Sequence, residues 1–362
     1  MIQRAGGLPP LLSLLVVVLC VAALAPAAGA ADAHVLVTRP ALARIAVGPA
    51  VVPDALLTGK RERTLLASAT WGGQYATPDG QTVTIQVSDA YPQDQSLPQH
   101  WADFLGSLVH GPELSRLVMY LAPQDEVSQV CGPGALACYG ATQSTLLASP
   151  EDPAPDFSAE AVITHEYGHH VAANRTNAPF DAIDYGTKRW SSYEQICAGA
   201  QTGRFFPGAE SEPNYQLNPG EAFAETYRVL NERRAGLPEP PWQVVSQSLY
   251  PDDIALAAVQ QDVLSPWTTA TATTKTAKLS KRTKSHTFTL ATPLDGELNA
   301  SVRGPAHSRT SIVVLQGAKQ LTRASGGSRV TASVTICGPR TVKIRVARTA
   351  GAGTFRLVVA KP

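Results

Sequence analysis

The segment ITHEYGHHVAANR, residues 163–175, constrains the chain most, because two of its histidines are spaced by one helical turn. Residues four positions apart lie on one face of a helix, so His165 and His169 can direct both imidazoles at one ion. Zinc accepts neutral imidazole nitrogens at about 2.0–2.1 Å. Glu166 lies roughly 100° further around the helix axis, where its carboxylate would face a zinc-bound water instead of binding the ion. The segment therefore predicts a helix that carries part of a zinc site.

A zinc site on this helix needs a third protein ligand. The metzincin extension of the motif requires a glycine and a histidine where this chain has Ala172 and Arg175, so that extension is excluded. Further along, NPGEAFAETYRVLNERR, residues 218–234, has the pattern of a second helix. This helix would carry Glu221 and Glu225 one turn apart, and we expect Glu221 to be the third ligand.

Glu221 has a second reading as a capping residue. Asn218 can cap the helix with Pro219 in its first position, and Asn218-x-x-Glu221 is also a capping box. A capping box does not account for Glu225, since two carboxylates one turn apart repel each other. The pair is explained if Glu221 binds the cation and Glu225 holds His165 or His169 through a hydrogen bond. Rival glutamates for the ligand position are Glu194, Glu210 and Glu212.

The helix around the histidines also has a start signal, since Asp156 or Ser158 can cap it. The rest of the first region reads as mixed α and β structure. Residues 81–89 alternate as a strand, residues 99–110 have helical spacing, and residues 114–121 are a candidate buried strand. Helical stretches are expected to dominate from Ser191 to about Val263.

His165-Glu166-x-x-His169 followed by Glu221-x-x-x-Glu225 resembles the gluzincin branch of the zincin metallopeptidases. The resemblance implies an α+β zincin-like catalytic domain with an upper sheet-and-helix half and a lower helical half. It also implies an edge strand that pairs with an extended substrate, for which YGATQSTLLAS, residues 139–149, is the candidate.

The resemblance further implies a zinc-dependent peptidase in which Glu166 activates a zinc-bound water and then donates a proton to the leaving amine. Gluzincins usually add another donor for the oxyanion. Tyr215 is the first candidate for that donor, and Tyr227 and His170 are alternatives. Gly168 has no side chain, and a glycine within a helix costs about 1 kcal/mol. Its presence suggests that another backbone segment lies close to the helix at this position.

The first thirty residues have the layout of a secretory signal peptide. Arg4 supplies the positive charge, residues 11–24 form an apolar run, and Ala28-Gly29-Ala30 suits cleavage. The apolar run is shorter than the roughly 18 residues of a spanning helix. We therefore expect a secreted, extracellular protein, in association with the cell envelope or free of it, without a membrane span after cleavage.

Export makes disulfides plausible for the cysteines that follow the leader. Cys20 lies within the leader, and the other four, Cys131, Cys138, Cys197 and Cys337, allow three pairings. Cys131 and Cys138 flank a loop with two glycines and a proline that could close a small ring. Pairing of the other two follows only by elimination, and two buried free thiols are the alternative. Zinc ligation by cysteine is not expected, because the chain has no CxxC pair.

Charge divides the chain into two regions. Residues 32–270 hold 13 Lys and Arg against 27 Asp and Glu, a net charge of −14, whereas residues 271–362 hold 16 against 2, a net charge of +14. Residues 268–276 contain six threonines and no large apolar residue, which predicts an exposed linker over 268–280. The expected domains are thus a signal peptide (1–30), a metallopeptidase domain (31–267) and a basic module (281–362).

The basic module shows short two-periodic segments separated by Gly, Pro and Ser, which predict a small antiparallel β-sandwich. Its closing segment, residues 353–359, resembles the last strand of the bacterial pre-peptidase C-terminal domain, a module that follows secreted peptidases. The module could hold anionic cell-envelope polymers, dock on the acidic region, or present a solvated basic surface without a specific partner. Nucleic acid is not expected, because aromatic residues hardly interleave with the charges.

These features predict a secreted zinc-dependent peptidase that acts on protein or peptide substrates. The rival interpretation is a secreted binding or adhesion protein with an inert zincin-like domain that acts through the basic module. A non-proteolytic amidase at the envelope is a third possibility. The presence of both the base and a full set of ligand candidates favours the enzyme.

Overall fold

A computed structural model of the chain describes residues 55–57, 70–155, 157–211, 213–237, 241–242, 246–338 and 341–362. The signal peptide prediction lies outside these residues. No helix among them is both long enough and apolar enough to cross a membrane.

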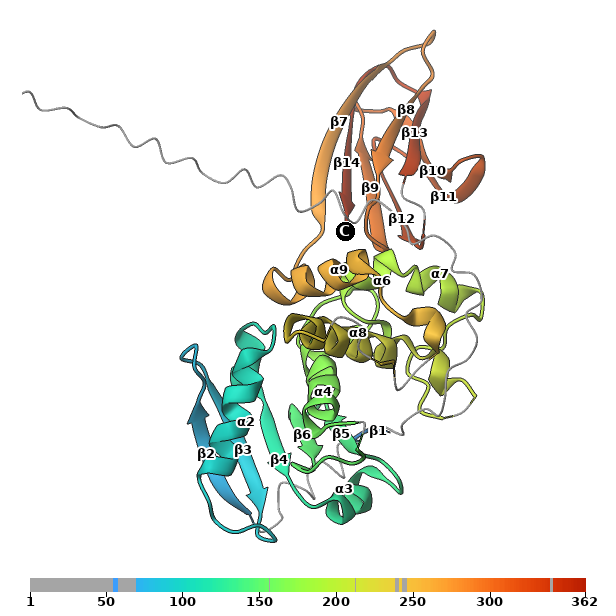
Figure 1. Ribbon diagram of the computed structural model, residues 1–362. Helices are drawn as coiled ribbons and strands as arrows, with labels where there is room; N and C mark the ends of the chain where they lie inside the picture. The colour runs from blue at the N-terminus through green and yellow to red at the C-terminus, as the bar shows by residue number, and fades with distance from the viewer. Residues whose placement is uncertain are drawn as a thin grey trace, which may run out of the picture. The chain divides into compact units, whose positions relative to one another are not determined.

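The first region is built on a six-stranded mixed sheet with the strand order β1-β5-β6-β4-β3-β2 (Figure 1). Strand β4 runs parallel to β3 and β6, and β1 runs parallel to β5, whereas the pairs β2–β3 and β5–β6 are antiparallel. The strands are β1 Ala55–Leu56, β2 Thr70–Ala76, β3 Thr82–Ser88, β4 Val118–Leu121, β5 Ala137–Gly140 and β6 Thr145–Ala148. The strand expected over residues 81–89 is therefore present as β3, whereas only the second half of the strand expected over 114–121 forms, as β4, because residues 114–116 belong to the 3-10 helix η2 (Pro112–Arg116).

The substrate-binding edge strand expected over residues 139–149 is wrong as a single element. This segment runs from the end of β5 through a turn into β6, and Ser144 in the turn has a positive φ of 58°. Strand β6 lies inside the sheet, between β5 and β4, and β1 pairs with β5 on the far side. Pairing between distant segments decides which strand forms the edge, and alternation within one segment does not reveal it.

The two faces of the sheet are covered by different helices. Trp101 and Leu105 of α2 (Ser96–Ser107) and Ile163 of α4 (Ala159–Ala173) share one apolar core with the sheet. Val127 of α3 (Gln124–Cys131) belongs to a second, smaller core that includes Leu147. Successive strand residues point to opposite faces, which allows one sheet to serve both cores.

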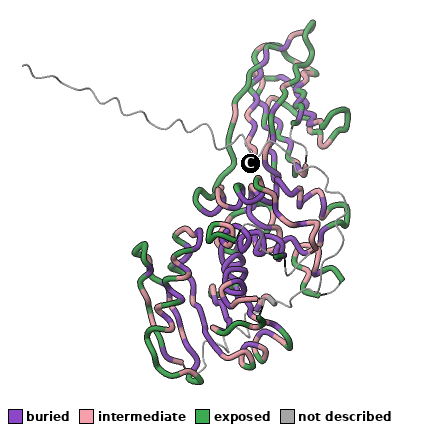
Figure 2. The backbone as a smooth tube through the Cα atoms, viewed as in Figure 1, coloured by how far each residue is buried: buried purple, intermediate pink, exposed green. Residues whose placement is uncertain are grey.

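Helices α4 and α8 (Pro219–Arg234) pack directly against each other. Ser158 caps α4 by accepting a hydrogen bond from the Ala161 amide at 3.1 Å, and Asn218 caps α8 by accepting one from the Gly220 amide at 3.0 Å. A Cβ on Gly168 would lie 2.7 Å from the Cα of Ala224, so the expected close backbone neighbour of this glycine is present. Residues 161–172 are buried throughout, and Figure 2 shows α4 as a buried rod.

Shorter helices complete the first region. The carboxylate of Asp262 in α9 (Asp253–Leu264) accepts hydrogen bonds from the backbone amides of Arg189 at 2.8 Å and Trp190 at 3.2 Å. These bonds join α9 to the start of α6 (Lys188–Tyr193). The remaining elements are η2 Pro112–Arg116, α5 Ala182–Tyr185, α6 Lys188–Tyr193, α7 Ile196–Gln201, η3 Tyr215–Leu217, η4 Gln247–Leu249 and α9 Asp253–Leu264.

The C-terminal region consists of two four-stranded antiparallel sheets that share one apolar core, as in a β-sandwich. One sheet has the order β12-β9-β14-β7 and the other the order β11-β10-β13-β8. The strands are β7 Thr271–Leu279, β8 Ser285–Ala291, β9 Gly296–Arg303, β10 Arg309–Gln316, β11 Lys319–Gly326, β12 Arg329–Ile336, β13 Thr341–Ala350 and β14 Gly353–Lys361.

The linker expected over residues 268–280 is largely wrong. Residues 271–279 form β7, which pairs with β14 along its whole length. Most of β7 is exposed, and only Ala277 and Leu279 are buried, which explains why its composition resembles a linker. Threonine is β-branched and favours strands where a partner strand is available.

Two disulfides form, Cys131–Cys138 and Cys197–Cys337, as the favoured pairing and the elimination together predicted. Near the second bridge, the backbone of Asp295 accepts a hydrogen bond from Nζ of Lys188 at 2.9 Å and donates one to Ser192 Oγ at 2.9 Å. The bridge and these bonds join α6 and α7 to the β-sandwich.

Candidate metal centre

Three buried side chains from α4 and α8 converge at one point. His165, His169 and Glu221 each offer one ligand atom, and these three atoms lie within 4.8 Å of one another. Among the described residues, this is the group of side chains that could hold a metal ion. Oε2 of Glu221 is 3.3 Å from Nε2 of His165 and 3.4 Å from Nε2 of His169. The two imidazole rings have centroids 5.0 Å apart. The structure thus brings together the three residues that the sequence predicts as ligands.

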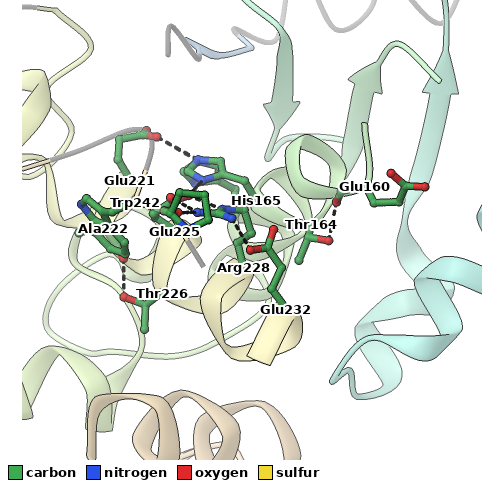
Figure 3. A network of polar contacts seen from close by, with 12 residues as sticks. Glu160, Thr164, His165, Glu221, Ala222, Glu225, Thr226, Arg228, Glu232 and Trp242 are labelled. Atoms are coloured by element: carbon green, nitrogen blue, oxygen red, sulfur yellow. Dashed lines mark hydrogen bonds and ion pairs between the residues drawn. The ribbon is translucent and has the colours of Figure 1, made fainter. Parts of the chain in front are cut away.

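Glu225 holds His165 from the other side of the ring. Its Oε2 lies 3.0 Å from Nδ1 of His165, so Nε2 is left to face Glu221 (Figure 3). Burial alone would raise the pKa of the Glu225 carboxyl, but the Arg228 guanidinium and the His165 imidazole outweigh it and hold the pKa at about 2. An ionised Glu225 orients His165 and makes Nε2 a better electron donor.

Arg228 is a residue of this site that the sequence reading missed. Its Nε and Nη2 donate to the two carboxylate oxygens of Glu225 at 3.0 and 2.5 Å, and Nη1 donates to Oε2 of Glu232 at 2.5 Å. It also donates to the backbone oxygen of Pro241. The side chain is 1% exposed, and its carboxylate neighbours raise its pKa. In the sequence, Arg228 follows Glu225 by three residues and precedes Glu232 by four, and both spacings place the side chains on one face of a helix. These spacings were the sequence signal for this network.

Glu166 and Tyr215, the two residues expected to act chemically, both adjoin residues of the three-residue cluster. Glu166 is 2% exposed and follows His165 on α4. Tyr215 precedes α8, is buried, and directs its hydroxyl at Oε2 of Glu221 at 3.4 Å. The Tyr215 hydroxyl can therefore donate a hydrogen bond beside the candidate ligand Glu221.

The alternative oxyanion donors lie elsewhere. Tyr227 donates its hydroxyl hydrogen to the backbone oxygen of Val109 at 2.7 Å. His170 lies 2.8 Å from the backbone oxygen of Glu113 through Nε2 and 3.0 Å from the Tyr139 hydroxyl through Nδ1. Burial lowers the pKa of His170 to about 4, against the opposing effects of Glu113, so this imidazole is neutral near pH 7. The structure therefore assigns His170 to packing of α4 and not to the three-residue cluster.

The rival glutamates are not part of the cluster within the described residues. Glu194 is a buried residue at the end of α6, and Glu210 accepts the backbone amide of Leu56 at 3.3 Å. Glu212 lies outside the described residues.

A pocket of about 410 Å³ lies at the end of the polar network that begins at His165. Glu232 belongs both to this network and to the pocket wall, and Thr164, the residue before His165, lines it as well. The other lining residues are Phe104, Ser107, Leu108, Ser158, Glu160, Ala161, Asn231, Arg234, Ala235 and Leu237.

Comparison with known proteins gives little. No family model matches the chain, and no curated protein matches it. Among solved structures, the crystal structure of the pre-peptidase C-terminal domain of collagenase from Bacillus anthracis is similar, with a TM-score of 0.21 and 18% sequence identity. The match covers 24% of this chain and 87% of that chain. A TM-score this low supports no inference about activity.

Proposed function

We propose that the protein is a secreted zinc-dependent peptidase in which His165, His169 and Glu221 would hold the metal. The observation that carries this proposal is the convergence of two imidazoles and one carboxylate, all buried, from two packed helices. Two histidines and a glutamate form a donor set of catalytic zinc sites, in which a further position is open to substrate or water.

The separations between the donors support one shared ion. Ligands that each lie about 2.0–2.1 Å from a tetrahedral ion are separated from one another by about 3.3–3.4 Å. Oε2 of Glu221 is 3.3 and 3.4 Å from the two Nε2 atoms. Direct N–H···O hydrogen bonds are most often shorter, near about 2.9–3.0 Å, and charged ones are shorter still.

The chemistry that zinc supplies in such a donor set is Lewis acidity, which makes water a stronger acid and polarises a carbonyl oxygen. Glu166 would accept the proton of the attacking water and return it to the leaving amine. Tyr215 would donate its hydroxyl hydrogen to the negative oxygen that develops on the substrate. Glu225, itself held by Arg228, would keep His165 in the ring orientation that presents Nε2.

Secretion is part of the proposal because of the leader pattern and the disulfides. Two disulfides among the described residues fit an oxidising compartment.

The test combines metal content with hydrolysis. Protein purified without chelators is assayed for zinc per chain and for hydrolysis of a mixed protein substrate, as wild type, Glu166→Gln, Glu221→Gln and the control Glu210→Gln. We expect about one zinc per chain in wild type. Glu166→Gln should keep the metal but lose at least about 100-fold in hydrolysis, because the base is gone. Glu221→Gln should lose the metal, and Glu210→Gln should match wild type.

Wild type that carries no zinc contradicts the proposal, as does an equal loss of zinc in Glu210→Gln and Glu221→Gln. Zinc binding without hydrolysis of any peptide or amide would favour the inert binding protein.

A further inference from the structure

Three arginines form a row across the outer face of the sheet β12-β9-β14-β7. Arg329 of β12 stands opposite Arg303 of β9, and Arg303 stands opposite Arg356 of β14. All three are exposed, and the residues beside them in each strand, such as Val302 and Leu357, are buried. The alternation of strand residues therefore directs all three arginines to the same outer face. With strands about 4.8 Å apart, the row spans about 10 Å at its base.

This row is unfavourable for the isolated protein. Like charges placed directly opposite in a sheet repel each other. Residues 271–362 contain two acids, Asp295 and Glu297. Asp295 is buried, and Glu297 lies six residues from Arg303, opposite Thr335 at the other end of β9. None of the three arginines forms an ion pair with another described residue, so no counter-charge to the row is found in the part of the chain that the structure describes.

The same face offers one more cation and several hydroxyls. Lys278 of β7 is exposed and stands opposite Thr354, two positions from the point where β7 meets Arg356. Exposed hydroxyls surround the row, including Ser301 and Thr331, which are 3.2 Å apart. The arginine side chain matches carboxylate, sulfate or phosphate oxygens with two parallel hydrogen bonds. The face thus combines a repeated anion-binding group with hydrogen-bonding groups suited to sugar hydroxyls.

Nucleic acid fits this face less well. The outward positions of the four strands carry threonine, serine, asparagine, valine, alanine and charged residues, and no aromatic side chain on which a base could stack. We propose that the outer face of the β12-β9-β14-β7 sheet binds an anionic polysaccharide, whose acidic groups lie along the row Arg329–Arg303–Arg356. This proposal does not depend on the peptidase activity.

The test measures binding of the full chain to two probes, heparin and polygalacturonate, by titration calorimetry at several salt concentrations. The row variant is Arg303→Gln/Arg356→Gln. The matched control is Lys343→Gln/Arg345→Gln, which removes two exposed charges from β13 in the other sheet. Uncharged dextran and a DNA duplex complete the set.

We expect wild type to bind at least one of the two probes. The row variant should bind at least tenfold more weakly with a smaller salt dependence, and the control should stay within about twofold of wild type. The row variant should melt at the same or a higher temperature than wild type, because it relieves repulsion. Three results would overturn the proposal: no binding of either probe, equal loss in the row and control variants, or tighter binding of DNA than of both polysaccharides.

Discussion

At the scale of single residues, Arg228 balances the negative charge beneath His165. Glu225 has no exposed surface and Arg228 has almost none, so neither charge is compensated by water. A buried pair of this kind contributes little relative to apolar residues, but removal of one partner leaves the other charge buried and unpaired. The network that orients His165 therefore depends on a residue that does not touch the proposed metal.

Replacement of Arg228 should destabilise the protein and weaken metal binding. Arg228→Met is expected to lower the free energy of unfolding by about 3–5 kcal/mol, because Glu225 loses two hydrogen bonds. Arg228→Lys keeps the charge but not the paired geometry, and should fold while its zinc affinity falls about tenfold. Denaturant unfolding and a competitive zinc titration give the two values.

Arg233→Met on the same helix is the matched control. It breaks an ion pair of 3.1 Å with Asp253, whose side chain is 96% exposed, and should cost less than about 1 kcal/mol. Equal costs for Arg228→Met and Arg233→Met would refute the role assigned to Arg228.

His170 should make stability depend on pH. Its pKa falls from the ordinary 6.5 to about 4 in the folded protein, mainly because the ring is buried. Between these two pH values the imidazole is protonated in the unfolded chain and neutral in the native protein. The contribution is fully present above about pH 6.5 and is lost as the pH falls toward 4, by up to about 3 kcal/mol. The charged groups that act on this ring are Glu113, Arg175 and Arg116.

His170→Gln keeps a donor for the Glu113 backbone oxygen but cannot take up the proton. Unfolding free energies measured from pH 6.5 to 4.5 should therefore fall less steeply for His170→Gln than for wild type. Parallel profiles of the two proteins would show that His170 does not carry this dependence.

At the scale of helices and strands, the contact between α4 and α8 determines where the three proposed ligands meet. His165 and His169 come from one helix and Glu221 from the other, so a change in helix separation moves the carboxylate relative to both rings. Gly168 lies between the two histidines and meets the backbone of Ala224. The absence of a side chain at this position permits the approach.

Gly168→Ala should destabilise the protein although alanine is the better helix former. Helix propensity alone predicts a gain of about 1 kcal/mol. The new Cβ would lie 2.7 Å from Cα and 3.0 Å from the backbone oxygen of Ala224, and the overlap should cost about 1–3 kcal/mol beyond that gain. Urea unfolding measures the sign. Ala173→Gly, at the exposed last residue of α4, should lose at most about 1 kcal/mol from propensity alone.

Local spacing explains which parts of the site could be predicted from the sequence. The intervals between His165, His169 and Glu166, and between Glu221 and Glu225, are properties of single helices, so periodicity reveals them. The Asn218 cap and the strand over 81–89 are local in the same sense. The interior position of β6 and the pairing of β7 with β14 depend on distant partners, and both were mispredicted. Arg228 was missed because its burial depends on how α8 packs.

At the scale of the whole chain, the two disulfides cross-link it over very different lengths. Cys131 and Cys138 are separated by 7 residues within the first region, whereas Cys197 and Cys337 are separated by 140 residues and join α7 to the residue that follows β12 of the β-sandwich. A cross-link restricts the unfolded chain more when it closes a longer loop. We therefore expect the second bridge to couple the unfolding of the two regions.

Removal of the long bridge should cost more stability than removal of the short one. The chain-entropy relation gives about 5 kcal/mol for a loop of the length closed by Cys197–Cys337 and about 2.5 kcal/mol for the Cys131–Cys138 loop. Cys197→Ala/Cys337→Ala should thus unfold at the lower denaturant concentration of the two double variants. It should also split into two transitions if the bridge couples the first region to the β-sandwich, whereas Cys131→Ala/Cys138→Ala should keep the wild-type number of transitions. Chemical unfolding followed by tryptophan fluorescence and far-ultraviolet circular dichroism tests this. All five tryptophans precede Thr271, where the β-sandwich begins, so fluorescence follows the first region. A larger loss in the short-bridge variant would contradict the dependence on loop length, and a single transition in Cys197→Ala/Cys337→Ala would contradict the coupling of the two regions.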